Sequence, residues 1–177
     1  MTHPTVIAVA AVSGGGKTTI TKKLRERLSG SEALFFDAYE FDGAPENLTE
    51  WVENGPDYHQ WELDPLIDDI QSAQTQNASF LILDYPFSYK HEKVKPWIDY
   101  SVYIDTPLDI AMARRLLRDE VGPGVKEELT HYLHAGRKAY LEMLQSIKPD
   151  ADLVVDGTLS VENIVEHIIK NLSSEHH

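Results

Sequence analysis

A glycine-rich segment near the amino terminus combines residue types that hold phosphate groups. Residues 11–19 read Ala-Val-Ser-Gly-Gly-Gly-Lys-Thr-Thr and follow an apolar run typical of a buried strand. Glycines let backbone N–H groups converge at the start of a helix, where the helix dipole favours an anion. Lys17 can reach the β- and γ-phosphates of a nucleotide, and the Thr18 hydroxyl can bind Mg²⁺. We therefore predict a nucleotide-phosphate site formed by Ser13, Gly14, Gly15, Gly16, Lys17, Thr18 and Thr19.

This segment departs at one position from the phosphate-binding pattern G-x-x-x-x-G-K-[ST]. Ala11 stands where the pattern has its first glycine, whereas the closing Gly-Lys-Thr is complete. The alternative is a strand-to-helix turn with a purely structural role. Three consecutive glycines would destabilise a simple turn, so phosphate binding is the favoured interpretation.

Two aspartates directly follow predicted strands. Asp37 comes after the run at residues 33–36, where a carboxylate could take the proton of an acceptor hydroxyl, with Tyr39 lining the acceptor pocket. Asp84 comes after the run at residues 80–83 and is a candidate for holding Mg²⁺ beside the phosphate loop. The alternative for either aspartate is a turn or helix cap.

Three arginines lie within five positions of one predicted helix. Arg114, Arg115 and Arg118 precede Gly122-Pro123-Gly124, in a chain with only 16 Lys and Arg. Residues three or four apart share a helix face, so the cluster predicts a lid over about residues 114–126 that stabilises phosphate charge and excludes water. The alternative is a solvated face paired with the acidic residues that follow.

Strand-like and helix-like runs alternate along the chain. The strand-like runs are residues 5–12, 33–36, 80–83, 101–104 and 153–155, and the helix-like runs include 17–28, 107–120, 126–147 and 164–172. This order predicts an α/β fold with one mostly parallel five-stranded sheet and helices on both faces, in a single domain over residues 1–177. Ligands bind beyond the carboxyl ends of such strands. Residues 173–177 are expected to fray.

The amino-acid composition excludes or disfavours several classes of protein. The 177 residues include 16 Lys and Arg against 29 Asp and Glu, a formal charge of −13, and no Cys. Without Cys there is no disulfide framework or thiolate metal site. The negative charge disfavours nucleic acid and anionic membranes, and no run is long enough to span a bilayer. We expect a cytoplasmic protein with a small-molecule partner, and a homo-oligomer stays open.

The ordered set of motifs resembles the uridine kinase-like branch of the P-loop kinases, which includes phosphoribulokinase and nicotinamide riboside kinase relatives. The resemblance rests on residues 13–19, 37–39, 80–84, 114–119 and 148–153. It implies a three-layer P-loop NTPase fold, ATP and Mg²⁺ as cofactors, Asp37 as base, and Arg115 and Arg118 in the lid. It also implies that a loop with Asp156 and Gly157 contacts the adenine.

The resemblance does not extend to pyrimidine recognition. Residues 84–86 read Asp-Tyr-Pro where uridine kinases usually have Glu-Gly, and about ten residues separate a helix ending near Ile70 from the strand at Phe80, where they insert a longer hairpin. Tyr58, His59 and Trp61 are candidates for acceptor binding, because aromatic surfaces can stack a base or cover a sugar. They could equally pack on the core.

These patterns predict an ATP-dependent kinase that phosphorylates a hydroxyl of a nucleoside-like metabolite. Two alternatives stay open: a nucleotide-binding switch or slow NTPase that acts through a partner protein, and a kinase of a sugar phosphate or vitamin. The guanine-reading Asn-Lys-x-Asp sequence is absent from the chain, whereas the arginine cluster and Asp37 suit a closed acceptor site.

Overall fold

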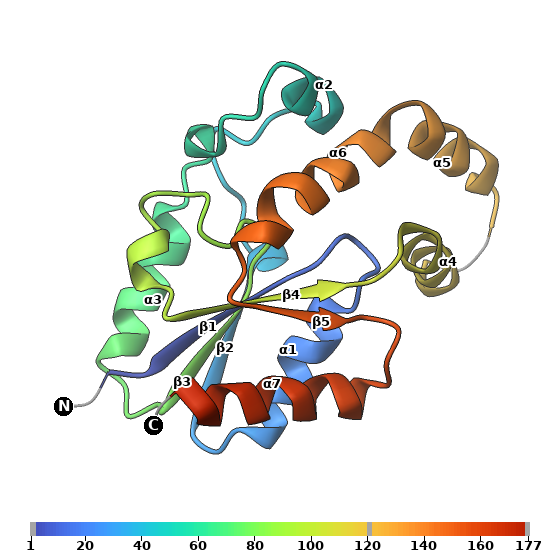
Figure 1. Ribbon diagram of the computed structural model, residues 1–177. Helices are drawn as coiled ribbons and strands as arrows, with labels where there is room; N and C mark the ends of the chain where they lie inside the picture. Colours follow the sequence, from blue (N-terminus) through green and yellow to red (C-terminus); the bar gives the residue numbers. More distant parts are fainter. Residues whose placement is uncertain (1–2, 120–121, 176–177) are drawn as a thin grey trace.

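The computed structural model describes residues 3–119 and 122–175, and these residues are built around one five-stranded sheet (Figure 1). The strand order is β2-β3-β1-β4-β5, and each neighbouring pair is parallel. The predicted α/β fold is therefore confirmed. The strands are β1 (Thr5–Ala10), β2 (Ser31–Phe35), β3 (Phe80–Asp84), β4 (Tyr100–Asp105) and β5 (Leu153–Asp156).

Helices connect the strands. The α-helices are α1 (Lys17–Arg27), α2 (Leu48–Glu53), α3 (Asp64–Gln74), α4 (Leu108–Arg118), α5 (Val125–His131), α6 (Arg137–Glu142) and α7 (Val161–Glu175). Short 3₁₀ turns occur at η1 (Phe36–Ala38), η2 (Tyr58–Gln60), η3 (Lys95–Trp97) and η6 (Lys148–Asp150), and π-helical turns at η4 (Tyr132–Gly136) and η5 (Met143–Ile147).

The structure differs from the predicted elements most clearly in three helical segments. The helix expected to end near Ile70 is α3, which continues to Gln74, so only residues 75–79 separate it from β3. The single helix expected over residues 126–147 is divided by the two π-helical turns. Residues 173–175, expected to fray, continue α7, whereas residues 176–177 lie outside the described residues, as do residues 120–121 of the predicted lid.

Alternate side chains of the central strands point to opposite faces of the sheet. Ile7 and Val9 of β1 pack with α1 and α7, whose apolar residues include Leu24 and Ile168. Val6 and Ala8 point to the opposite face, because successive residues of a strand face opposite sides. Figure 1 shows α1 and α7 together below the sheet, with α3 and α6 on the other side.

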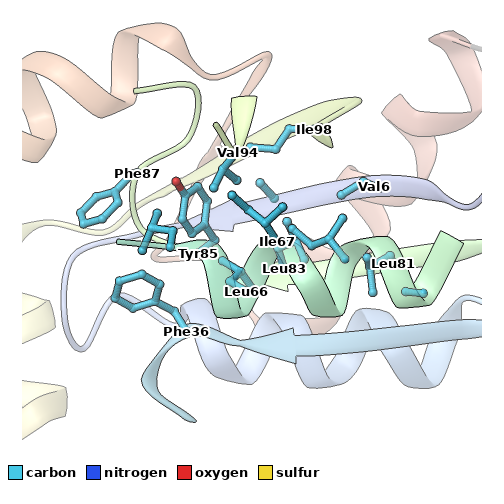
Figure 2. Close-up of a cluster of buried hydrophobic side chains, with 14 residues drawn as sticks. Val6, Phe36, Leu66, Ile67, Leu81, Leu83, Tyr85, Phe87, Val94 and Ile98 are labelled. Carbon is cyan, nitrogen blue, oxygen red and sulfur yellow. The ribbon is translucent and has the colours of Figure 1, made fainter. Parts of the chain in front are cut away.

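The second face has an aromatic end. Figure 2 shows Leu81 and Leu83 of β3 packed against Leu66 and Ile67 of α3, and Phe36 and Phe87 gathered near Tyr85. Phe36 begins the turn η1, and its burial anchors that turn at the end of β2. The next residue, Asp37, is thereby fixed near the carboxyl edge of the sheet.

The strand register brings the residues predicted for the site to one edge of the sheet. Asp84 at the end of β3 lies beside Val9 of β1 and Phe35 of β2. Because all three strands run in the same direction, the segments that follow them leave the sheet together. These segments are the glycine-rich loop after β1 and the turn containing Asp37 after β2.

Candidate active site

The glycine-rich loop between β1 and α1 has the backbone of an anion cradle. Gly14 and Gly16 have φ angles of +80° and +100°, which side chains rarely allow. A Cβ at Gly14 would lie 2.2 Å from the carbonyl oxygen of Ala111, so α4 also packs directly on the loop. No side chain among the described residues caps α1 at Gly16. Its first-turn N–H groups are therefore suited to an anion.

Ala11 fits this loop without strain. Among the described residues, the only non-glycine with a positive φ is Ser88, so position 11 needs no glycine for its backbone conformation. A Cβ placed on Gly15 would lie 2.9 Å from the Cβ of Ala11 and 2.8 Å from the carbonyl oxygen of Val12. The methyl group of Ala11 therefore occupies space that Gly15 leaves open.

Lys17, Thr18 and Asp84 meet at the loop. The Nζ of Lys17 lies 2.7 Å from Oδ1 of Asp84, and the Thr18 hydroxyl donates to Oδ2 at 2.6 Å. Asp84 is only 2% exposed. A buried carboxylate and a hydroxyl beside a phosphate cradle fit a magnesium ion that is bound largely through phosphate oxygens. The described residues contain no cluster of three or more acidic or His side chains for a metal held by protein alone.

Asp37 lies on the same cavity as the phosphate loop. This cavity has a volume of about 790 Å³, within the range of roughly 300–1,000 Å³ usual for small-molecule sites. Asp37 is exposed, and its charge helps to raise the pKa of Arg118, although the hydrogen bond from Arg118 to Asp119 is the larger cause. Asp37 and Arg118 both line this cavity.

The three arginines of α4 divide between two environments. Arg114 and Arg118, one turn apart, line the cavity, and Arg114 also donates to the carbonyl oxygen of Gly157 at 3.2 Å. Arg115, expected to face the phosphates, is 9% exposed and is not among the described residues that line the cavity. The expected placement of Arg115 therefore differs from the structure.

Arg115 instead ties α4 to the helices that follow. Its Nε donates to Glu128 at 3.0 Å, and its Nη1 donates to the Tyr140 hydroxyl. Its guanidinium carbon also lies 6.0 Å from the ring centre of Tyr132 and 5.5 Å from that of Tyr140. Planar guanidinium groups favour such combined stacking and hydrogen bonding, so Arg115 positions α5 and α6 relative to α4.

Aromatic residues line the other part of the cavity. Trp51 of α2, Tyr58 and Trp61 of the following segment and Phe87 after β3 contribute rings, and Glu142 of α6 contributes a carboxylate. Apolar side chains complete this part, from Phe36, Leu48, Val52, Met143 and Ile147. The structure therefore brings Tyr58 and Trp61 to the cavity, as the acceptor hypothesis expects.

Tyr39, His59, Asp156 and Gly157 are not among the described residues that line the cavity. The Tyr39 hydroxyl donates to Asp69 at 2.5 Å. The ring of His59 lies 5.6 Å from that of His91. Asp156 accepts hydrogen bonds from Thr158, which lower the pKa of its carboxyl group. These placements differ from the expected acceptor and adenine contacts.

Gly157 supports the loop indirectly. A Cβ at Gly157 would collide with the hydroxyl of Thr106, and this hydroxyl donates to the carbonyl oxygen of Gly15 at 2.9 Å. Thr106, at the end of β4, is buried. Gly157 therefore gives Thr106 the space to hold the phosphate loop.

Trp51 and Glu142 line the cavity but were not among the residues predicted for the site, whereas Arg114 belonged to the predicted arginine cluster. The four-residue spacing of Arg114 and Arg118 predicts that they share a helix face, and both line the cavity. The signal that could have identified Trp51 is its aromatic ring, close in sequence to Tyr58 and Trp61. No local pattern marks Glu142, since the predicted helix that contains it is broken in the structure by a π-helical turn on each side of α6.

Comparisons with known proteins show which proteins this chain is similar to. A sequence profile of the Phosphoribulokinase / Uridine kinase family matches residues 38–163. A uridine kinase of Staphylococcus haemolyticus is 23% identical over 183 residues, covering 88% of this chain and 88% of that protein. A uridine kinase of Leuconostoc citreum is 28% identical over 182 residues, covering 86% of this chain and 87% of that protein.

Solved structures share the fold. A sugar kinase from Janibacter sp. HTCC2649 superposes with a TM-score of 0.60 at 18% identity, covering 96% of this chain and 95% of that one. A gluconokinase from Sinorhizobium meliloti 1021 gives a TM-score of 0.54 at 17% identity, with complete coverage of both chains. In the described part of the chain, no helix is both long enough and apolar enough to cross a membrane.

Proposed function

The chain belongs to the phosphoribulokinase/uridine kinase family and is an ATP-dependent phosphotransferase, and from this premise we propose that its acceptor is a hydroxyl of a nucleoside-like metabolite. The observation that carries the proposal is one cavity that joins the phosphate loop, Asp37 and a wall of aromatic side chains, which are Trp51, Tyr58, Trp61 and Phe87. A flat ring bound at such a wall would leave its attached sugar to extend toward the loop.

In this proposal, different residues of the chain have different roles in phosphoryl transfer. The loop N–H groups and Lys17 hold the β- and γ-phosphates of ATP. Asp37 takes the proton from the acceptor hydroxyl as the bond from its oxygen to the γ-phosphorus forms. The bond from that phosphorus to the oxygen bridging to the β-phosphate breaks, and ADP leaves with that oxygen.

Arg114 and Arg118 provide positive charge at the same cavity. Two guanidinium groups from one face of α4 can stabilise the charge that spreads over the transferring phosphoryl oxygens. Thr18 and Asp84 would hold Mg²⁺, which when bound neutralises phosphate charge. The helices α2 and α6 contact each other and both line the cavity, so they would limit the access of water to the reacting groups.

The experiment that tests the proposal measures ADP release with Mg²⁺ and ATP against nucleosides, vitamins, sugars and sugar phosphates. We expect a nucleoside-like compound to accelerate ADP release well above the rate without acceptor. Acceleration by a sugar phosphate or vitamin alone would give the chain a different acceptor class. ATP consumption that no compound accelerates would favour a slow NTPase.

A further inference from the structure

The charges that line the cavity are segregated. The described cations of the lining are Lys17, Lys22, Arg114 and Arg118, and all four stand on α1 or α4, which pack around the phosphate loop. The described lining residues from α2, residues 58–61 and α6 contribute no cation. A second phosphate or carboxylate bound at that end would therefore lack a basic partner.

Four rings form the wall of that end, which we call the aromatic wall: Trp51, Tyr58, Phe87 and Trp61. Each ring packs edge-to-face with the next, at centroid distances of 5.1 Å for Trp51–Tyr58, 5.3 Å for Tyr58–Phe87, 5.1 Å for Phe87–Trp61 and 6.4 Å for Trp61–Trp51. Ring faces are electron-rich, so such a wall favours flat ligands and positive charge.

Glu142 lies at the edge of this wall with hydrogen-bonding capacity to spare. The hydroxyls of Tyr58 and Ser146 both donate to its Oε1, at 3.3 and 2.6 Å. No cation among the described residues forms an ion pair with Glu142. Burial raises the pKa of Tyr58, and the charge of Glu142 and the hydrogen bond to it raise this pKa further.

We infer that Glu142 selects the acceptor: the aromatic wall binds a flat ring whose edge carries N–H donors or positive charge, and the cavity rejects acceptors that carry an anionic group at that end. The second oxygen of Glu142 receives the ring edge, while the aromatic wall supports its face. This inference rests on the proposed function and names the class of acceptor within it.

The test compares three ribosides whose flat rings differ in charge. Orotidine carries a carboxylate, uridine is neutral with one ring N–H, and nicotinamide riboside is cationic. Affinity is measured by calorimetry without any nucleotide, so that phosphoryl transfer plays no part. We expect nicotinamide riboside to bind most tightly, uridine less tightly and orotidine most weakly.

Glu142→Gln removes the charge and keeps an oxygen for Tyr58 and Ser146. The substitution should lower the affinity for nicotinamide riboside about tenfold, which is the loss expected for one hydrogen bond or contact to a charged group. It should raise the affinity for orotidine. Glu53→Gln is the matched control, because Glu53 pairs with Lys138 between α2 and α6 but is not among the described lining residues. This control should keep the order of the three affinities.

Several results would overturn the inference. One is equal binding of orotidine and nicotinamide riboside by the unaltered chain, and another is an identical change for all three ribosides in Glu142→Gln. If none of the three ribosides bound, a flat ring would not be the group that the cavity recognises. Acceptor-dependent ADP release without this order of affinities would leave the proposed function intact and reject only the role of Glu142.

Discussion

Lys17 and Asp84 form an ion pair of 2.7 Å beneath the phosphate loop, and the carboxylate of that pair is almost fully buried. Lys17 starts α1 and Asp84 ends β3, so the pair fastens the helix to the sheet at the edge where the cavity opens. Thr18 contacts the second carboxylate oxygen. The same three side chains therefore stabilise the loop and supply the groups proposed to bind Mg²⁺ and phosphate.

Lys17→Ala should weaken nucleotide binding and slow turnover. It should also lower the free energy of unfolding by about 1–3 kcal/mol, because the buried Asp84 loses its cation. Calorimetric titration with ATP and urea unfolding measure the two effects. Lys22→Ala removes an exposed lysine of the same helix and should change stability by no more than about 0.5 kcal/mol. Unchanged ATP affinity in Lys17→Ala would contradict the assignment of the loop.

Asp37→Asn should lower kcat by about 10²–10⁴-fold, the usual contribution of a positioned general base, while ATP affinity stays within a few-fold. The substitution keeps the shape of the side chain and removes only its basicity. Steady-state kinetics and ATP titration separate the two quantities. Glu40→Gln, an exposed carboxylate three residues later, is the control and should retain kcat. Full activity of Asp37→Asn would exclude Asp37 as the base.

Arg118 and Arg115 should respond differently to substitution. The side chain of Arg118 is 61% exposed and lines the cavity, so Arg118→Ala should reduce kcat with little change in stability. Arg115→Ala removes buried contacts to Glu128 and Tyr140 and should cost about 2–4 kcal/mol of stability. Urea unfolding and kcat are measured for both variants. Arg115→Lys should not restore stability, because an ammonium group lacks the planar fork.

The opposite pattern of effects would contradict the different roles given to Arg115 and Arg118. If Arg115→Ala were as stable as the unaltered chain and had lost kcat, Arg115 would have to reach the phosphates, as the family resemblance implies. The structure instead gives its guanidinium two hydrogen-bonding side chains from beyond α4.

The sequence could predict the parts of the site whose residues are neighbours in the chain or directly follow a strand. Apolar, β-branched runs such as residues 5–12 mark buried strands, and parallel strands bring the residues after them to one edge. Gly14–Gly16, Lys17 and Thr18 are neighbours in sequence, and Asp37 and Asp84 directly follow strands. The alternation of elements predicts that these strands are parallel, and their convergence then depends on the strand order, which the structure supplies.

The rest of the site depends on packing between distant segments. Arg114 and Arg115 are adjacent, and the partner that holds Arg115 inside is Tyr140, 25 residues later. Tyr39 follows the same turn as Asp37, yet its hydroxyl is held by Asp69, 30 residues later. No local pattern contains these pairings, so residue type and spacing alone could not separate cavity residues from packing residues.

The space shared by Ala11 and Gly15 yields a prediction about the loop. Gly15→Ala should greatly weaken ATP binding, because its Cβ would lie 2.8 Å from the carbonyl oxygen of Val12 and 2.9 Å from the Cβ of Ala11. Ala11→Gly should keep ATP affinity and lower stability by about 0.5–1 kcal/mol through the added freedom of the unfolded chain. The double variant should stay impaired, since the Val12 contact remains. Normal ATP binding by Gly15→Ala would refute this account.

His91 gives the fold a dependence on pH. His91 is 2% exposed, and burial lowers the pKa of its ring, although its Nε2 lies 2.9 Å from the carbonyl oxygen of Trp61. His59 and Lys93 also disfavour its charged form, whereas Asp64 favours it. In the unfolded chain the ring takes up a proton near pH 6.5, roughly the ordinary value. The unfolded state then binds more protons, so stability should fall as pH drops below that value.

His91→Gln should reduce this loss, because a Gln amide can still donate to the Trp61 carbonyl oxygen and does not titrate. Urea unfolding at pH 7.5 and pH 5 measures the difference for each chain. His167→Gln, an exposed residue of α7, is the control and should keep the original pH dependence. If His91→Gln lost as much stability between the two pH values as the unaltered chain, other groups would have to cause the dependence. A smaller loss confined to His91→Gln would assign the pH dependence to protonation of His91 in the unfolded chain.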